Sequence, residues 1–400
     1  MRAGSSLDRL VVASASLIVI IGLLTVYSAG RVVSGENIFL RQVVWLAVGS
    51  GLLVFTTRMD LRFLDEIAPW LYIASCLLLL VVLFFGTGPA GRWLHIGPLR
   101  FQPSEFAKAA MLLMAAHVLS SRRHPLQERL GRPGLFVWAI PAVVLTWLEP
   151  DVGTAAAMIF MLLLTFHWAG VGLSWIFLFI SPLLAALCSM STLLWICFAV
   201  VLALVLIYRR VSLPGWLTLF GLNALVGALS PVAWSLLKPY QKARLMTFLN
   251  PASDPHGAGW NVIQSRVAVG SGGSLGQGFL RGTQKELAFL PARHTDFVFS
   301  VWAEEFGFLG CFLLLAAYSV LVWRMLVIAR RSASPFRSIL TAGVAAYFAM
   351  QVFMNVGMTI GIMPVTGLPL LLVSYGGSHL IASLFLIGLV LNAGMTWREF

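Results

Sequence analysis

The sequence predicts an all-α integral membrane protein, a polytopic helical bundle with one large extracytoplasmic loop. Of its 400 residues, 59% are hydrophobic and only 10% are charged, whereas soluble domains use roughly 25% charged residues. Apolar runs of about 18 residues or more recur along the whole chain, and each can cross a hydrocarbon core of about 30 Å as a helix. We therefore expect a single polytopic membrane domain over residues 1–400.

Apolar runs bounded by charged residues or by Pro and Gly predict twelve spans. The first run is longer than the apolar core of a signal peptide and leads into a second run, so we expect it to be retained. Between residues 170 and 239, Pro182, a break at 189–192 and Pro214 leave open a broken or re-entrant helix. The runs lie near 10–29, 38–56, 68–86, 103–120, 134–149, 153–169, 173–190, 192–208, 214–237, 297–323, 338–357 and 378–396.

The distribution of arginine predicts that both termini are cytoplasmic. An even number of spans places both termini on one side of the membrane. Basic residues of short loops stay on the cytoplasmic side. One set of alternate loops carries fifteen arginines, whereas the opposite short loops with their flanks carry only Arg31, Arg41, Arg92 and Arg100.

This topology explains the net charge of +12, so we expect no nucleic-acid partner. The four cysteines lie in apolar runs without a CxxC pair or a nearby His at metal spacing, and we expect them to be reduced. They are Cys76, Cys188, Cys197 and Cys311.

The largest hydrophilic segment, residues 238–296, falls on the outer side and holds seven basic and three acidic residues. Within it, "WNVIQSRVAVG" places Trp260, Ile263 and Val267 at the spacing of a short amphipathic helix at the membrane interface. The glycine-dense stretch "GSGGSLGQGFLRG" that follows has two interpretations. It is either a flexible loop or a backbone that approaches an anionic ligand closely.

The fourth run begins with the charged stretch "RFQPSEFAKAA". Pro103 opens a helix, and Glu105 and Lys108 share one face at i and i+3. One interpretation is an interfacial helix start with a local ion pair. The other is that Arg100, Glu105 and Lys108 enter one outer opening, where two cations and a carboxylate suit a diphosphate or a metal-bound diphosphate.

The tenth run begins with "LPARHTDFVFS", which sets Arg293, His294 and Asp296 against an apolar helix. Glu304 and Glu305 follow, about 12 to 13.5 Å deeper at 1.5 Å per residue. An Asp at this place is either a helix cap or a functional carboxylate at the outer mouth of the bundle. The neighbouring basic, glycine-dense loop favours the second interpretation.

Two further segments carry polar residues on the same side. "EPDVGT" places Glu149 and Asp151 in a tight outer turn, where helix capping is also an explanation. "GIMPVTGLPLLLVSYGGSHL", residues 361–380, is interrupted by Pro and Gly and contains Ser374. Irregular backbone at membrane depth is tolerated where it lines protein or a watery cavity, so we interpret this segment as a re-entrant or broken element that borders the same cavity.

These motifs together resemble the SEDS family, the bacterial shape, elongation, division and sporulation polymerases. The resemblance runs from about Leu10 to Gly394. The blocks "GAGWNVIQSRVAVGSGG" and "RGTQKELAFLP" are more similar to the rod-shape branch than to the division branch. The family usually has ten spans, so the resemblance implies either a two-helix insertion or a split span between 170 and 239. The matching segments are "RFQPSEFAK", "EPDVGT", "LNPASDPHGAGWNVIQSRVAVGSGG", "LGQGFLRGTQKELAFLPARHTDFVFSVWAEEFGFLG" and "PVTGLPLLLVSYGGS".

The resemblance implies a peptidoglycan glycosyltransferase of the bacterial cytoplasmic membrane that polymerises lipid II during cell elongation and cell-shape maintenance. It also implies a class B penicillin-binding protein as transpeptidase partner, together with membrane proteins of the elongation complex. The essential carboxylate of the family falls on Asp296, which we expect to be the catalytic base. Expected substrate contacts are Arg100, Glu105, Lys108, Arg293, Lys285 and Ser374.

The chemistry agrees with these residue types. A sugar transfer from a diphosphate-linked donor needs a base for the acceptor hydroxyl and cations for the departing diphosphate. The sequence shows no cluster of metal ligands, although a divalent cation, Mg or Mn, between Asp296, Glu105 and the diphosphate stays open.

Two other classes stay open. One is a flippase or another transporter of lipid-linked precursors, which would place its ionisable residues near the bilayer midplane. The other is a scaffold without catalytic activity that recruits a transpeptidase.

Overall fold

The computed structural model describes residues 7–31, 37–88, 91–96, 99–121, 137–236, 242, 259–283 and 292–395. Within these ranges the chain forms thirteen helices and one two-stranded sheet, which confirms the all-α prediction. The helices are α1 (Arg9–Gly30), α2 (Ile38–Thr57), α3 (Leu61–Phe85), α4 (Pro103–Ser120), α7 (Ile140–Leu148), α8 (Val152–Trp168), α9 (Leu173–Cys188), α10 (Thr192–Tyr208), α11 (Leu213–Leu236), α13 (Trp260–Ser271), α15 (Val298–Arg331), α16 (Pro335–Thr359) and α17 (Gly377–Met395). The strands are β1 (Leu94–Ile96) and β2 (Leu99–Phe101).

A helix stands at each of the twelve predicted runs, and α3 and α15 extend furthest beyond their predicted bounds. α3 begins at Leu61 because Asp60 caps it, with its carboxylate accepting the N–H of Arg62 at 2.8 Å. α15 continues to Arg331, beyond the predicted end at residue 323. The reason is that Arg324 forms an ion pair with Asp8 at the start of α1. Local charge pairing therefore extends helices beyond their apolar runs.

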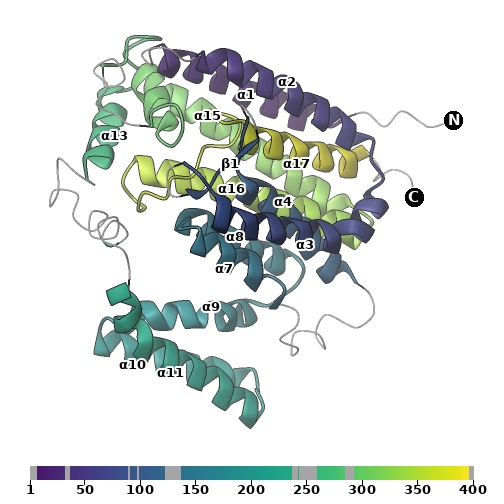
Figure 1. Cartoon of the computed structure of the whole chain (residues 1–400), viewed down its shortest axis with the longest axis vertical. Helices are drawn as coiled ribbons and strands as arrows, with labels where there is room; N and C mark the ends of the chain where they lie inside the picture. Colours follow the sequence, from purple (N-terminus) through teal and green to yellow (C-terminus); the bar gives the residue numbers. More distant parts are fainter. Residues whose placement is uncertain are drawn as a thin grey trace.

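Seven of the described helices are long and apolar enough to cross a membrane, namely α1, α2, α3, α11, α15, α16 and α17. α8, α9 and α10 are shorter apolar helices. Of the seven, α16 and α17 are the most buried, and α16 packs against α15, α4 and α8. These two helices thus form the centre of the main bundle (Figure 1).

The region from 170 to 236 forms three separate helices, α9 to α11, that lie together at one end of the molecule beyond α7 and α8 (Figure 1). Pro182 lies inside α9 without ending it, and the predicted break at 189–191 is a turn between α9 and α10. Asn223 of α11 donates to the hydroxyl of Ser181 on α9 at 3.0 Å. The unit has its own small apolar core of Leu178, Ala185, Phe198, Leu202 and Leu206.

The amphipathic helix predicted around Trp260 is present as α13, but a different face is buried. Val262, Ser265 and Ala268 are buried, whereas Val267 is exposed. Hydrogen bonds of Ser265 explain this difference. Its hydroxyl lies 2.6 Å from that of Ser300 on α15 and donates to the carbonyl of Thr359 at the end of α16. Hydrogen bonds to the bundle, rather than apolar spacing alone, thus set the orientation of α13.

The glycine-dense loop after α13 completes an interrupted helix. α15 is broken at Gly307, whose backbone has φ +61° and ψ −159°. The N–H groups of Gln277 and Gly278 donate to the carbonyls of Glu304 and Glu305 at 2.9 and 3.0 Å. On the other side of the break, the N–H groups of Phe308 and Leu309 donate to the carbonyls of residues 273 and 274. The backbone of this loop therefore makes a close approach, but to the chain's own helix.

We expect Gly307→Ala to destabilise the fold by on the order of 3 kcal/mol, because the backbone there is left-handed and a Cβ would lie against another main chain. A Cβ added at Gly307 would lie only 2.3 Å from the backbone nitrogen of Gly276. Thermal unfolding of the detergent-solubilised protein, followed by tryptophan fluorescence, measures the effect. Gly51→Ala is the matched control, because Gly51 lies exposed on α2 with no atom within 4 Å of such a Cβ. Equal unfolding temperatures of the two variants would contradict this prediction.

Candidate active site

Asp296 lies in the turn at residues 292–297, directly before α15, and is half-buried. The N-cap position of α15 is Phe297, one residue after Asp296. Asp296 therefore precedes the N-cap position, and its role as a helix cap or as a functional carboxylate stays a prediction. A Cβ placed on Gly367 would lie 3.6 Å from Oδ2 of Asp296, so the segment between α16 and α17 lies beside the carboxylate.

That segment, residues 361–376, has no helix and is packed closely against its neighbours. Leu368, Leu370 and Ser374 are among its buried residues. A Cβ on Gly22 of α1 would meet the carbonyl of Leu372 at 2.4 Å. The prediction of a broken element within the protein is thus confirmed for its backbone.

Ser374 has a structural place in this segment. Its hydroxyl donates to the carbonyl of Thr295 at 2.6 Å and accepts the N–H of Leu370 at 2.8 Å. The side chain is fully buried. In this structure the hydroxyl ties the broken segment to the turn of Asp296, and a contact with substrate stays a prediction. Sequence reasoning could not show this tie, because the carbonyl of Thr295 is a main-chain group 79 positions away in the sequence.

Glu105 and Lys108 form an ion pair inside the bundle. Lys108 Nζ lies 2.8 Å from Glu105 Oε1, and the two side chains are 0% and 2% exposed. Pro103 is at the first position of α4, as predicted, and the pair lies within the protein rather than on its surface. The ammonium group also lies 5.1 Å from the ring centroid of Tyr347. Burial of a charge is tolerated here because each partner compensates the other.

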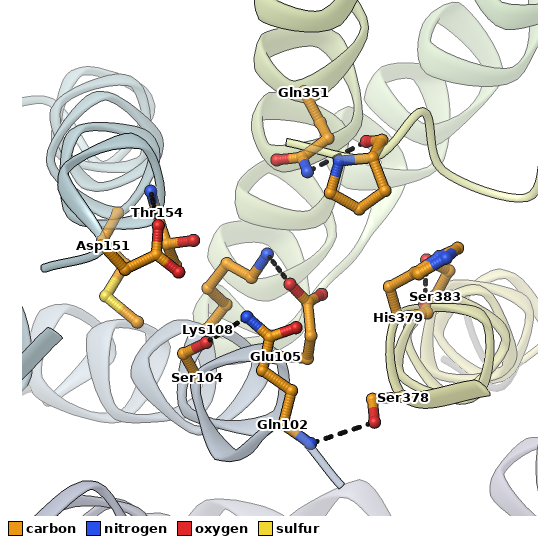
Figure 2. A network of polar contacts seen from close by, with 12 residues as sticks. Gln102, Ser104, Glu105, Lys108, Asp151, Thr154, Gln351, Ser378, His379 and Ser383 are labelled. Carbon is orange, nitrogen blue, oxygen red and sulfur yellow. Dashed lines mark hydrogen bonds and ion pairs between the residues drawn. The ribbon is translucent and has the colours of Figure 1, made fainter. Parts of the chain in front are cut away.

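Residues from three other elements surround this pair. Figure 2 shows Glu105 between Lys108 and the ring of His379 on α17, with Gln351 of α16 and Asp151 at the start of α8 nearby. Gln351 donates to the carbonyl of Pro369 at 3.1 Å. The buried pair is thus placed where α4, α8, α16 and α17 meet.

Three polar residues of α16 connect the buried pair to Asp296, and sequence reasoning missed these residues. Tyr347, Gln351 and Asn355 are spaced by four residues, so they lie on one face of the helix over about 12 Å of rise. Tyr347 contacts Lys108, and Asn355 donates to the carbonyl of Asp296 at 2.9 Å. The available signal was the strict i, i+4, i+8 spacing of polar side chains within an apolar run.

The remaining basic candidates occupy different places. Arg100 is exposed on β2, opposite His95 of β1. Arg293 is buried three residues before Asp296, and this burial lowers the pKa of its guanidinium group. Lys285 lies outside the described residues, as does the "NPASDPHGA" part of the large loop.

The "EPDVGT" turn between α7 and α8 confirms the predicted cap. Oδ1 of Asp151 accepts the N–H of Thr154 at 3.2 Å and lies 3.3 Å from Nη1 of Arg92. A Cβ on Gly153 would lie 2.4 Å from the carbonyl oxygen of Thr366, so this turn packs against the broken segment. Burial raises the pKa of the Glu149 carboxyl to about 8; the Asp151 carboxylate adds to the rise and Arg92 opposes it.

We expect the stability of the protein to fall as pH rises from about 4.5 to about 8, because over this range the unfolded chain has lost the Glu149 proton that the folded protein still holds. In the unfolded chain this carboxyl has its ordinary pKa of 4.5, so the stabilisation is complete below that value, and it is lost once pH has passed the folded pKa of about 8. The unfolding temperature, measured at several pH values between these two pKa values, should decline less in Glu149→Gln than in wild type. Glu66→Gln, at an exposed site on α3, is the control. An unchanged pH profile in Glu149→Gln would count against the assignment.

Among the described residues, no three His, Cys, Asp or Glu side chains come together as ligands for a metal ion. The described side chains therefore do not form a metal site by themselves. A cation held jointly with a substrate diphosphate is a matter for experiment.

Known proteins are similar to this chain over nearly its full length. The chain is 36% identical to the peptidoglycan glycosyltransferase MrdB of Escherichia coli K12, over 94% of this chain and 92% of that protein. It is 33% identical to the peptidoglycan glycosyltransferase RodA of Treponema pallidum, over 98% of each chain. Each of these matches spans nearly the full length of the relative.

Solved structures agree as well. A chain from work on the structural coordination of polymerization and crosslinking by a peptidoglycan synthase complex matches with a TM-score of 0.73, 31% identity and 99% coverage of both chains. The rod shape determining protein RodA of Thermus thermophilus matches with a TM-score of 0.64 and 28% identity over 99% of both chains. The family model for FtsW, RodA and SpoVE, described as cell cycle protein, matches residues 8–198 and 194–399. The chain therefore belongs to the FtsW/RodA/SpoVE family, the SEDS family that its sequence motifs resemble.

Proposed function

We propose that this chain is a peptidoglycan glycosyltransferase that polymerises lipid II during cell elongation, with Asp296 as its general base. The observation that carries the proposal is the placement of Asp296, a half-buried carboxylate at the start of α15 beside a broken segment of the bundle. The names of relatives that match over almost the whole chain support the same reaction.

In this reaction the acceptor hydroxyl oxygen attacks the anomeric carbon of the donor sugar, and the bond to the diphosphate breaks. The carboxylate of Asp296 takes the proton of the hydroxyl, which raises the nucleophilicity of the oxygen as the bond forms. Attack from the face opposite the diphosphate inverts the anomeric centre, as in inverting glycosidases. A strong general acid is not needed, because the departing diphosphate is already a stable anion.

Cations near this turn would stabilise the departing diphosphate. Arg293 is closest in sequence to Asp296, and Arg100 is exposed on the outer hairpin. Lys285 belongs to the same proposal. Glu105 and Lys108 are buried and paired in this structure, so a direct contact with the diphosphate requires the packing around the pair to open.

We further propose that the chain lies in the bacterial cytoplasmic membrane with both termini inside, and that the large loop at 238–296 faces outward. A class B penicillin-binding protein would cross-link the strands it makes. The structural neighbour from a peptidoglycan synthase complex, in which polymerization and crosslinking are coordinated, supports such a partner. Membrane proteins of the elongation complex belong to the same proposal.

A precursor flippase is the second candidate, because Glu105, Lys108, Glu304 and Glu305 are all buried in the bundle. Charged groups at membrane depth are expected in transporters as well. Polymerisation in detergent separates the two functions, since detergent micelles have no second compartment.

The test is an assay of the purified chain with lipid II, in which the glycan strands are separated by gel electrophoresis. We expect strands to form, and to be longer or more abundant when the partner transpeptidase is added. A parallel sample with EDTA, then with Mg or Mn restored, tests the divalent cation. Absence of strands from the chain with its partner and a divalent cation present would contradict the proposed function.

A further inference from the structure

Three hydrogen bonds hold the main chain at the turn of Asp296, one on each of three consecutive carbonyls. The carbonyl of His294 accepts the N–H of Tyr375 at 2.8 Å. The carbonyl of Thr295 accepts the hydroxyl of Ser374 at 2.6 Å. The carbonyl of Asp296 itself accepts the side-chain amide of Asn355 at 2.9 Å. The turn is therefore fixed through its backbone just before α15 begins.

Asn355 makes the contact to Asp296, and it makes a second contact at the same time. Its amide nitrogen also donates to the carbonyl of Leu368 at 2.7 Å, and Leu368 directly follows Gly367, which lies beside the Asp296 carboxylate. Asn355 is fully buried. A primary amide has two donor hydrogens, so one side chain joins the turn of Asp296 to the broken segment.

We propose that Asn355 is a positioning residue for Asp296, which sets the carboxylate relative to the segment at 367–370 by holding both backbones at once. This inference rests on the proposed role of Asp296 as the base. Removing the amide leaves the carboxylate chemically intact and lets its backbone shift. Because a displacement of about 1 Å from the reactive geometry costs about 10²-fold in rate, the effect falls on turnover.

Gln351 provides a matched comparison within the same helix. It lies one turn before Asn355 on the same face, is also fully buried, and donates its amide to the carbonyl of Pro369 at 3.1 Å. It therefore holds the same broken segment, one residue away from Leu368. The hydrogen bond of Gln351 joins α16 to that segment, whereas Asn355 also bonds to Asp296. A general weakening of the broken segment affects both variants, whereas mispositioning of Asp296 affects Asn355 variants alone.

The experiment compares Asn355→Leu with Gln351→Leu, since leucine is close in size to both amides and removes the donors. Lipid II polymerisation by each purified variant gives kcat and KM, and thermal unfolding confirms that each is folded. We expect Asn355→Leu to lower kcat by about 10²-fold with KM changed by less than about threefold, and Gln351→Leu to lower kcat by less than about tenfold. Asn392→Leu, near the end of α17, removes a buried amide that donates to the carbonyls of Thr56 and Met59, and it should keep kcat within about threefold of wild type.

Equal losses of kcat in the two variants, or a change confined to KM in Asn355→Leu, would overturn the inference. Should Asn355→Leu fail to fold, Asn355→Ser replaces it in the comparison, since serine keeps one donor. We expect a kcat between those of wild type and an inactive variant. A wild-type kcat in Asn355→Ser would overturn the inference. Asp296→Asn is measured in parallel. An active Asp296→Asn removes the proposed base itself, whereas an inactive Asp296→Asn with fully active Asn355 variants removes only the positioning role.

Discussion

Asp296→Asn is expected to lower the rate of lipid II polymerisation by about 10³-fold or more, because a positioned general base contributes about 10² to 10⁴ in rate. The amide has nearly the size of the carboxylate but cannot take the proton of the acceptor hydroxyl. The held carbonyls at residues 294–296 are main-chain groups, so the turn keeps its hydrogen bonds in this variant. The rate of strand formation by purified protein measures the effect.

The control for Asp296→Asn is an Asp to Asn substitution at Asp60, outside the candidate site. Asp60 caps α3, and asparagine caps helices about as well as aspartate, so Asp60→Asn should polymerise at nearly the wild-type rate. Asp296→Asn should unfold at a temperature close to that of wild type. An Asp296→Asn protein with near wild-type turnover would falsify the assignment of the base.

Lys108→Met is expected to cause the largest loss of stability, about 3 to 5 kcal/mol, because removing one partner leaves the other charge buried and uncompensated. Both side chains are almost completely buried, and the ammonium group also faces the ring of Tyr347. Thermal or denaturant unfolding in detergent measures the loss. A Lys108→Met protein as stable as wild type would show that Glu105 finds another partner or a proton.

The double variant with Glu105→Gln and Lys108→Met separates stability from function. It has no uncompensated charge, and replacing a buried pair by neutral residues is often neutral for stability. We expect the double variant to recover most of the lost stability. If Lys108 contacts the diphosphate during turnover, the recovered protein still polymerises slowly; wild-type polymerisation by this stable variant would confine the pair to a structural role.

The helices could be predicted from the sequence because burial in lipid requires long apolar runs whose backbone bonds stay within the helix. Asp296 stood out as a charge at the end of such a run, and the resemblance to the SEDS family then singled it out as the expected base. A neutral polar residue within an apolar run does not stand out from its neighbours in this way. Gln351 and Asn355 lie within an apolar run, and their partners, Pro369 and Leu368 with Asp296, are main-chain carbonyls. Main-chain partners leave no residue-type pattern in a sequence.

The burial of Glu105 and Lys108 could not be predicted for a related reason. Their i, i+3 spacing predicts the ion pair equally well on a surface and in a core. Only the packing of α16 and α8 against α4 decides between them. Likewise, the sequence left the glycine-dense loop as either a flexible loop or a close approach to an anionic ligand. Its partner is instead the broken helix α15, and the break at Gly307 is set by contacts with residues 272–276.

The break at Gly307 also bears on the order in which the molecule assembles. A continuous helix forms through contacts between near neighbours, whereas the part of α15 around Gly307 depends on residues 273–278, about thirty positions earlier. Closing such a loop before its bonds form has an entropic cost, which slows non-local structure relative to helices. We therefore expect the part of α15 after Gly307 to form first. The turn of Asp296 is held by Asn355, Ser374 and Tyr375, which lie still further away in the sequence, so the candidate base is assembled only after these non-local contacts have formed.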